Sequence, residues 1–219
     1  SAIAWKIAPP FESYNVVPKG QIIEKEKPES DVVSVSLLKG FPEELEGEII
    51  FCHQDNLNTD GIYPGKYTYI DDFTPEQMAE VVMENYDPDF GKIVEKGDII
   101  VGGYNFGTGS SREQAATALI YRGIQLVMAG SFSQTYKRNA INNGFLVIET
   151  PELLADLKSE FGTDKLSIKT GWEMKIKFKS CTITIGNKKY PISPVGTAAQ
   201  ELILTKGLEN WVKERINNE

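Results

Sequence analysis

Residues 97–149 read GDIIVGGYNFGTGSSREQAATALIYRGIQLVMAGSFSQTYKRNAINNGFLVIE, in which apolar runs alternate with polar and alanine-rich segments. The apolar runs predict three buried strands, at residues 99–101, 124–129 and 145–148. Between them, the pattern predicts one helix that ends near Tyr121 and a second over residues 131–142, stopped by Asn143 and Gly144. Strands that alternate with helices form parallel sheets through crossover connections, so this stretch predicts an α/β fold.

The sequence before residue 97 also predicts both strands and a helix. Apolar runs at residues 32–38 and 49–51 predict two more strands. A helix is predicted over residues 74–85, because Pro75 suits the first helical position and Gln77 completes a capping box with Thr74.

The pattern changes in the C-terminal part. A short helix is expected after Pro151, and apolar residues then alternate with lysines over residues 174–178. The runs 182–185 and 188–192 flank a Gly186-Asn187 turn, which predicts a β-hairpin.

The chain ends in a predicted helix. It starts at Thr197, with a capping box to Gln200, and breaks near Gly207. Residues 1–30 carry prolines and a charged run but no regular period, which predicts a lead-in segment. We therefore expect one α/β domain with a mixed sheet over residues 31–219.

Composition narrows the range of functions. The 219 residues include 23 basic and 31 acidic side chains, and the formal charge of −8 argues against nucleic acid as a partner. Two cysteines and one histidine exclude a disulfide framework, a four-cysteine site and a multi-histidine metal site built from this chain alone. No apolar run approaches the ~20 residues of a membrane span, and no leader pattern opens the chain, so we expect a soluble protein of a reducing compartment.

The densest functional signal is GYNFGTGSSRE at residues 103–113, between a predicted strand and a predicted helix. One interpretation is structural: the glycines make a turn, and Ser110 with Glu113 forms a capping box. This does not explain Arg112, since the positive end of the helix dipole disfavours a cation. Hydroxyls, free N–H groups and a guanidinium together predict a site for a carboxylate or phosphate. The stretch lacks both the Walker motif and the dinucleotide fingerprint, which disfavours a nucleotide.

The second signal is the polar loop DNLNTDGIYPGKY at residues 55–67. By itself it predicts a surface turn rich in Asx residues and glycine. Beside the first motif it predicts part of the same site, since a serine takes a proton from carbon only where its alkoxide is stabilised. Asp60 would supply a carboxylate there, and Lys66 would hold a second substrate carboxylate.

The third signal lies in residues 131–145, which end in KRNAINNGF. Packing and helix capping are favoured here over direct contact with substrate. Three further candidates, Cys52, His53 and Cys181, lack metal-ligand partners at a recognised spacing, and both cysteines are expected in or near the core. The lysines of residues 165–189 predict the solvated face of strands.

In this order, the three segments resemble the swivel domain of the aconitase superfamily. The resemblance covers about residues 30–205 and implies a single swivelling β/β/α domain, of the aconitase C-terminal or isopropylmalate dehydratase small-subunit type. Residues 106–117 and 60–67 are most similar to the fungal homoaconitases. Isopropylmalate dehydratase small subunits usually have Cys and His where this chain has Thr108 and Gln114.

The resemblance implies a hydro-lyase reaction: the reversible hydration of cis-homoaconitate to homoisocitrate, in lysine biosynthesis through 2-aminoadipate. It makes Ser110 the base that removes the carbon-bound proton and Asp60 the acidic residue near that base. Ser111 and Arg112 match the residues that bind a substrate carboxylate. Aconitase carries an arginine a short way after the position of Asp60, whereas this chain offers Lys66 on that side.

The resemblance also implies a four-iron four-sulfur cluster held by three cysteines of other domains or of another subunit. This chain alone is then expected to be inactive, with cluster-bearing catalytic domains as its partner. A mitochondrial matrix location is implied, or a cytoplasmic one for a bacterial or archaeal small subunit. Two alternatives stay open: a 3-isopropylmalate dehydratase small subunit of leucine biosynthesis, and a non-catalytic anion-binding regulatory module.

Overall fold

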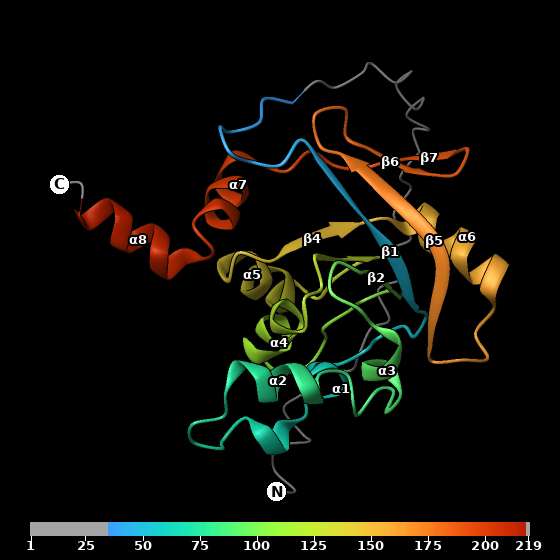
Figure 1. The fold of residues 1–219 in the computed structure, drawn as a ribbon, viewed down its shortest axis with the longest axis horizontal. Helices are drawn as coiled ribbons and strands as arrows, with labels where there is room; N and C mark the ends of the chain where they lie inside the picture. Colours follow the sequence, from blue (N-terminus) through green and yellow to red (C-terminus); the bar gives the residue numbers. More distant parts are fainter. Residues whose placement is uncertain (1–34, 218–219) are drawn as a thin grey trace, which may run out of the picture. The chain divides into compact units, whose positions relative to one another are not determined.

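The computed structural model describes residues 35–217, so the predicted lead-in segment 1–30 lies outside the described residues. Seven strands form one mixed sheet with the order β4-β3-β2-β1-β5-β6-β7 (Figure 1). Four of them are parallel: β1 (Glu44–Cys52), β2 (Ile99–Gly102), β3 (Leu126–Ala129) and β4 (Leu146–Glu149). Three continue the sheet in antiparallel pairing: β5 (Ser167–Lys177), β6 (Thr182–Ile185) and β7 (Lys188–Pro191). The predicted α/β fold with a mixed sheet is confirmed.

Both faces of the parallel strands are buried. Successive side chains of a strand point to opposite faces, so Ile50 and Ile100 enter one hydrophobic core and Ile49 and Ile99 enter the other. All four side chains are fully buried. This double burial explains why these strands appear in the sequence as unbroken apolar runs.

Helices cover the two faces. The first core is closed by α1 (Thr59–Ile62), α2 (Pro75–Val81), α3 (Phe90–Ile93), α4 (Gln114–Arg122) and α5 (Gln134–Asn142), which lie on one side of the parallel strands (Figure 1). The second core receives three leucines of α6 (Pro151–Phe161) and one side chain of α7 (Thr197–Leu204). The chain also forms a short 3-10 helix, η2 (Gly65–Tyr67), and a terminal helix, α8 (Leu208–Asn217), that buries no side chain.

Strand β1 is longer than its predicted apolar run, and its additional residues Glu44–Glu48 pair with β5. Lys175 of β5 lies 2.7 Å from Glu44 and 2.6 Å from Glu46 across the antiparallel ladder. Lys175 and Lys177 are therefore on the solvent-accessible face of β5, as predicted, and they pair with glutamates of β1.

Several predicted helix boundaries are confirmed. Thr74 and Gln77 form the capping box of α2. Gly123 and Gly144 follow α4 and α5 with φ of 92° and 72°, values that glycine adopts without steric cost. The expected break near Gly207 separates α7 from α8.

The structural interpretation of Ser110, in which it forms a capping box with Glu113, is wrong. Helix α4 begins only at Gln114, with Glu113 as its N-cap residue and no side-chain capping bond. The Ser110 hydroxyl instead lies 3.0 Å from the hydroxyl of Thr59, the first residue of α1. Ser110 is therefore part of the connection that precedes the helix.

The capping box predicted from Thr197 is also wrong, because Gly196 is the N-cap of α7. Gln200 is buried and its side chain accepts a hydrogen bond from the Leu38 N–H at 2.8 Å. The strand predicted over residues 32–38 is not formed in its described part, residues 35–38, where the Leu38 N–H is bonded to a side chain and not to a strand. Residues 32–34 lie outside the described residues.

Candidate functional site

The polar loop and the glycine-rich loop meet at the carboxyl ends of two adjacent parallel strands. The loop at residues 53–58 follows β1 and the loop at residues 103–113 follows β2. Asn58 and Thr108 form a short parallel bridge, in which the Thr59 N–H donates to the Thr108 carbonyl at 2.8 Å. The structure thus brings together the two motifs that the sequence predicted to share a site.

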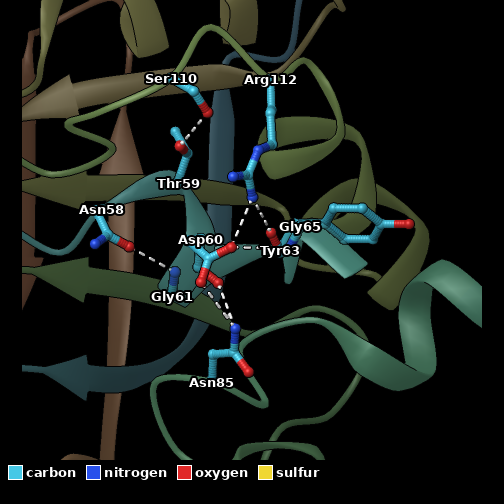
Figure 2. A network of polar contacts seen from close by, with 9 residues as sticks. All are labelled: Asn58, Thr59, Asp60, Gly61, Tyr63, Gly65, Asn85, Ser110 and Arg112. Carbon is cyan, nitrogen blue, oxygen red and sulfur yellow. Dashed lines mark hydrogen bonds and ion pairs between the residues drawn. The ribbon is translucent and has the colours of Figure 1, made fainter. Parts of the chain in front are cut away.

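A hydroxyl pair lies at this junction. The Oγ1 of Thr59 and the Oγ of Ser110 are 3.0 Å apart, a hydrogen bond in which either oxygen can donate (Figure 2). Thr59 is 2% exposed, whereas Ser110 is exposed. Ser110 therefore lies at the surface, and its hydroxyl is hydrogen-bonded to the hydroxyl of a buried threonine.

The glycine-rich loop fits tightly against the third motif. Gly107 has a φ of 74°, and a Cβ there would lie 2.2 Å from the ring of Tyr136, which is on α5. The Gly107 N–H donates to the Leu57 carbonyl at 2.8 Å, and Phe106 exchanges backbone hydrogen bonds with the segment at residues 131–133. Only glycine therefore fits at residue 107. The glycine-rich loop is hydrogen-bonded to Leu57 on one side and to residues 131–133 on the other.

Arg112 is clamped at one nitrogen. Its Nη1 donates to the Asp60 carboxylate at 2.9 Å and to the Tyr63 carbonyl at 3.0 Å (Figure 2). Gly65 lies against this pair, since a Cβ there would be 3.0 Å from Asp60 Oδ1 and 3.1 Å from both Nη atoms. In the described part of the chain, the Nη2 and Nε donors of Arg112 have no protein acceptor.

Asp60 is held as a carboxylate. The Arg112 guanidinium and the Gly65 N–H, which donates at 2.8 Å, hold the pKa of Asp60 below its usual range. Asn85 donates to the other carboxylate oxygen at 3.0 Å and to the Asp60 backbone carbonyl at 3.1 Å. With its acceptor oxygens occupied in this way, Asp60 orients Arg112.

The two remaining predicted site residues, Ser111 and Lys66, make contacts of different kinds. Ser111 is exposed, and its carbonyl accepts a hydrogen bond from Asn139 Nδ2 at 2.9 Å. Lys66 forms an ion pair with Glu84 at 2.7 Å and lies 4.7 Å from the centre of the Tyr67 ring. The structure therefore gives the three consecutive residues Ser110, Ser111 and Arg112 separate polar contacts, to Thr59, Asn139 and Asp60 respectively. Lys66 makes its ion pair with Glu84, which takes part in none of these contacts.

Three polar residues of the site were not predicted: Thr59, Asn85 and Asn139. Thr59 belongs to the polar sequence at residues 55–67 and Asn139 to the third motif, so both lie in segments that the sequence had indicated. Asn85 carried no signal, because it follows an unremarkable helix and reaches Asp60 from 25 residues away. Only the packing of the helices defines these partners.

The chain's cysteines do not form a cluster site. Cys52 and Cys181 are buried free thiols that belong to different hydrophobic cores. Burial raises the pKa of Cys52 to about 12, which leaves the thiol protonated. Across residues 35–217, no group of three or more His, Cys, Asp or Glu side chains is placed to hold a metal ion. None of the helices described has both the length and the apolar character to cross a bilayer.

The fold and the site define a mixed α/β domain that carries a serine and a clamped arginine on loops at the carboxyl ends of its parallel strands. The chain belongs to the aconitase C-terminal domain family, whose model matches residues 21–153. This confirms the resemblance to the aconitase swivel domain.

Named relatives agree with this family. The chain is 49% identical over 193 residues to a mitochondrial homoaconitase of Candida parapsilosis, covering 85% of this chain and 28% of that protein. It is 50% identical over 190 residues to a mitochondrial homoaconitase of Candida albicans, covering 84% of this chain and 28% of that protein. The chain thus spans less than a third of the length of these relatives.

A solved structure is also similar. A 3-isopropylmalate dehydratase of Methanocaldococcus jannaschii matches with a TM-score of 0.67 and 34% sequence identity, over 80% of this chain and 96% of that chain. The fold is therefore that of the isopropylmalate dehydratase type, as expected from the motifs.

Proposed function

We propose that this chain is the swivel domain of a homoaconitase. It supplies the base and a carboxylate-binding residue for the reversible hydration of cis-homoaconitate to homoisocitrate, in lysine biosynthesis. The observation that carries the proposal is the pair of hydroxyls of Ser110 and Thr59, 3.0 Å apart, beside the clamped Arg112. The identity of 49% to a homoaconitase supports the choice of substrate.

In this proposal Ser110 moves the proton. In the dehydration direction the Ser110 alkoxide takes the carbon-bound proton of homoisocitrate, the C–H electron pair forms the double bond of cis-homoaconitate, and the hydroxyl group leaves as hydroxide. In the hydration direction hydroxide adds to the double bond and Ser110 returns the proton to carbon. A serine alkoxide forms only where donors stabilise its charge. The buried Thr59 hydroxyl is one such donor, because it has no need to reorganise when the charge develops.

Arg112 binds a substrate carboxylate. Asp60 and the Tyr63 carbonyl occupy Nη1 only, and a guanidinium has five N–H donors in a planar fork. The Nη2 and Nε donors form an edge that matches the two oxygens of a carboxylate. Asp60 fixes the direction of that edge, and Ser111 adds a hydroxyl close by in sequence.

The remaining parts of the enzyme are proposed to lie on other domains or another subunit. With two cysteines in separate cores, this chain lacks the thiols for a four-iron four-sulfur cluster, so the cluster is assigned to those partner domains. Since the named relatives are mitochondrial proteins, we assign the complete enzyme to the mitochondrial matrix.

The proposal is tested on the complete enzyme, with the cluster-bearing domains present. Purified enzyme should interconvert homoisocitrate and cis-homoaconitate, and the isolated 219-residue chain should not. Since a 3-isopropylmalate dehydratase has the same fold, 3-isopropylmalate is the competing substrate to assay. A higher kcat/KM for 3-isopropylmalate would refute the homoaconitase assignment. Full activity after Ser110→Ala would instead indicate a non-catalytic module.

A further inference from the structure

Asn139 is a buried polar side chain that joins α5 to the loop carrying Ser110 and Ser111. It is 8% exposed, and its Nδ2 donates to the Ser111 carbonyl at 2.9 Å across 28 residues of sequence. A buried side-chain amide requires a hydrogen-bond partner. For Asn139 that partner is the carbonyl of Ser111, the residue after the proposed base.

The last turn of α5 holds Asn139 firmly. Asn143 donates to the Asn139 carbonyl twice, from its backbone N–H at 3.0 Å and from its side chain at 2.8 Å. Asn139 is therefore fixed at its backbone by the helix end and at its side chain by Ser111. The helix end predicted from Asn143 and Gly144 therefore also fixes the Asn139 amide as a donor directed at the loop.

The hydrogen bond from Asn139 to the Ser111 carbonyl fixes the orientation of a whole peptide unit. The Ser111 carbonyl and the Arg112 N–H belong to the same planar peptide unit, and in a trans peptide they point in opposite directions. A donor on the carbonyl from α5 therefore directs the Arg112 N–H away from α5. In the described part of the chain this N–H has no backbone acceptor, so it is available to a bound anion.

We propose that Asn139 is a positioning residue for the serine–arginine site. By holding the Ser111–Arg112 peptide, it sets the direction of the Arg112 N–H and the place of Ser110, without touching substrate itself. This inference rests on the proposed function for its catalytic consequence. Its structural part, the orientation of one peptide, is independent of the reaction.

A matched pair of variants tests the proposal in the complete enzyme. Asn139→Asp keeps the shape of the side chain and replaces the donor by an acceptor that repels the Ser111 carbonyl. Asn142→Asp makes the same chemical change at the last residue of α5, whose side chain is not hydrogen-bonded to the described loop. Asn139→Ala removes the donor without adding charge, and replaces the aspartate variant if that variant unfolds.

The first measurement is amide hydrogen exchange of a peptide spanning residues 107–116. Exchange should accelerate in Asn139→Asp and stay at the wild-type rate in Asn142→Asp, because only the first loses the bond to Ser111. Unchanged exchange in Asn139→Asp and Asn139→Ala would overturn the proposal. This readout does not depend on the enzyme's substrate.

The second measurement separates positioning from stability. A misplaced catalytic group costs about 10- to 100-fold in kcat, and we expect this loss from Asn139→Asp. In a Ser110→Ala background the additional loss should become smaller, since there is no base left to position and only the effect on the Arg112 N–H remains. An equal additional loss in that background would overturn the proposal. Lack of cis-homoaconitate hydration by the wild type would refute the proposed function, and hydrogen exchange would still decide the role of Asn139.

Discussion

Arg112 and Asp60 form an ion pair 2.9 Å long although 52 residues separate them in the sequence. The pair is half-exposed, with 24% of the Arg112 side chain and 50% of the Asp60 side chain accessible. Exposed ion pairs contribute little to stability because water screens them. The role that this geometry favours is orientation: Asp60 and the Tyr63 carbonyl hold one nitrogen of the guanidinium and leave the others open.

Replacing the proposed base should remove turnover without unfolding the domain. Ser110→Ala deletes one exposed hydroxyl, so we expect kcat to fall by about 10²- to 10⁴-fold and the melting temperature to stay close to that of the wild type. The measurement is the absorbance of cis-homoaconitate formed from homoisocitrate by the complete enzyme. Ser159→Ala, at an exposed position of α6, is the control and should be fully active.

The supporting hydroxyl gives a prediction of its own. Thr59→Val preserves the shape of a buried side chain and deletes the donor to Ser110, which should lower kcat by about 100-fold. Without that donor the Ser110 alkoxide is less stable, so the limb of the pH–rate profile on which activity rises should move to higher pH. Thr184→Val, on β6, controls for the substitution. An unshifted profile with unchanged kcat would contradict the role of Thr59.

The carboxylate site requires an arginine specifically. Arg112→Lys keeps the charge, but one ammonium cannot bond Asp60, the Tyr63 carbonyl and a substrate carboxylate in the planar arrangement of a guanidinium. We expect kcat/KM for homoisocitrate to fall by about 10²-fold or more. The same exchange at the exposed Arg138 serves as control. Steady-state parameters equal to wild type would disprove the proposed contact.

The loop geometry predicts a strong steric effect at Gly107. Gly107→Ala would place a Cβ 2.2 Å from the Tyr136 ring at a φ of 74°, so we expect a loss of about 3–5 kcal/mol in the free energy of unfolding. Gly186 also has positive φ, but a Cβ added there would meet no atom within 4 Å, and Gly186→Ala should cost only about 1 kcal/mol. Urea denaturation measures both, and equal losses would show that the loop yields to accommodate the methyl group.

The lowered pKa of Asp60 predicts that the stability of the folded state depends on pH. Because Arg112 and the Gly65 N–H hold the pKa of Asp60 below its usual range, its charge stabilises the folded state at pH values above the unfolded-state pKa of about 3.9. This contribution is lost as the pH falls through the lower folded-state pKa. The urea midpoint of the wild type should exceed that of Asp60→Asn from pH 8 to 5, and the difference should disappear in more acidic solution. Asp164→Asn, at an exposed position, controls for the loss of one charge.

Local patterns predicted the architecture well because they report burial and chain direction. The runs at Ile99–Gly102 and Leu126–Ala129 are buried on both faces, so their apolar character is continuous and their strand assignment follows. Gly123 and Gly144 marked helix ends, since a positive φ favours glycine wherever it occurs. These features depend on neighbouring residues and are therefore visible in the sequence.

The same local rules failed for polar side chains that could hydrogen-bond to more than one partner. Ser110 could cap a helix or bond the start of α1, and Gln200 could complete a capping box or bind the segment at Leu38. Either partner satisfies the polar group, and in both cases the distant one was selected by packing. Sequence spacing contains no information on that competition.

The amino-acid sequence by itself determined the alternation of strands and helices, the glycines at the turns and the identity of the reactive side chains. The tertiary structure alone decided which of them meet. The pairs Thr59–Ser110, Asp60–Arg112 and Asn139–Ser111 join residues 51, 52 and 28 positions apart. They form because parallel strands β1, β2 and β3 end at one edge of the sheet, so that the loops and helices following them converge there. Hydrogen bonds act only over about 3 Å, and the register of the sheet supplies that proximity.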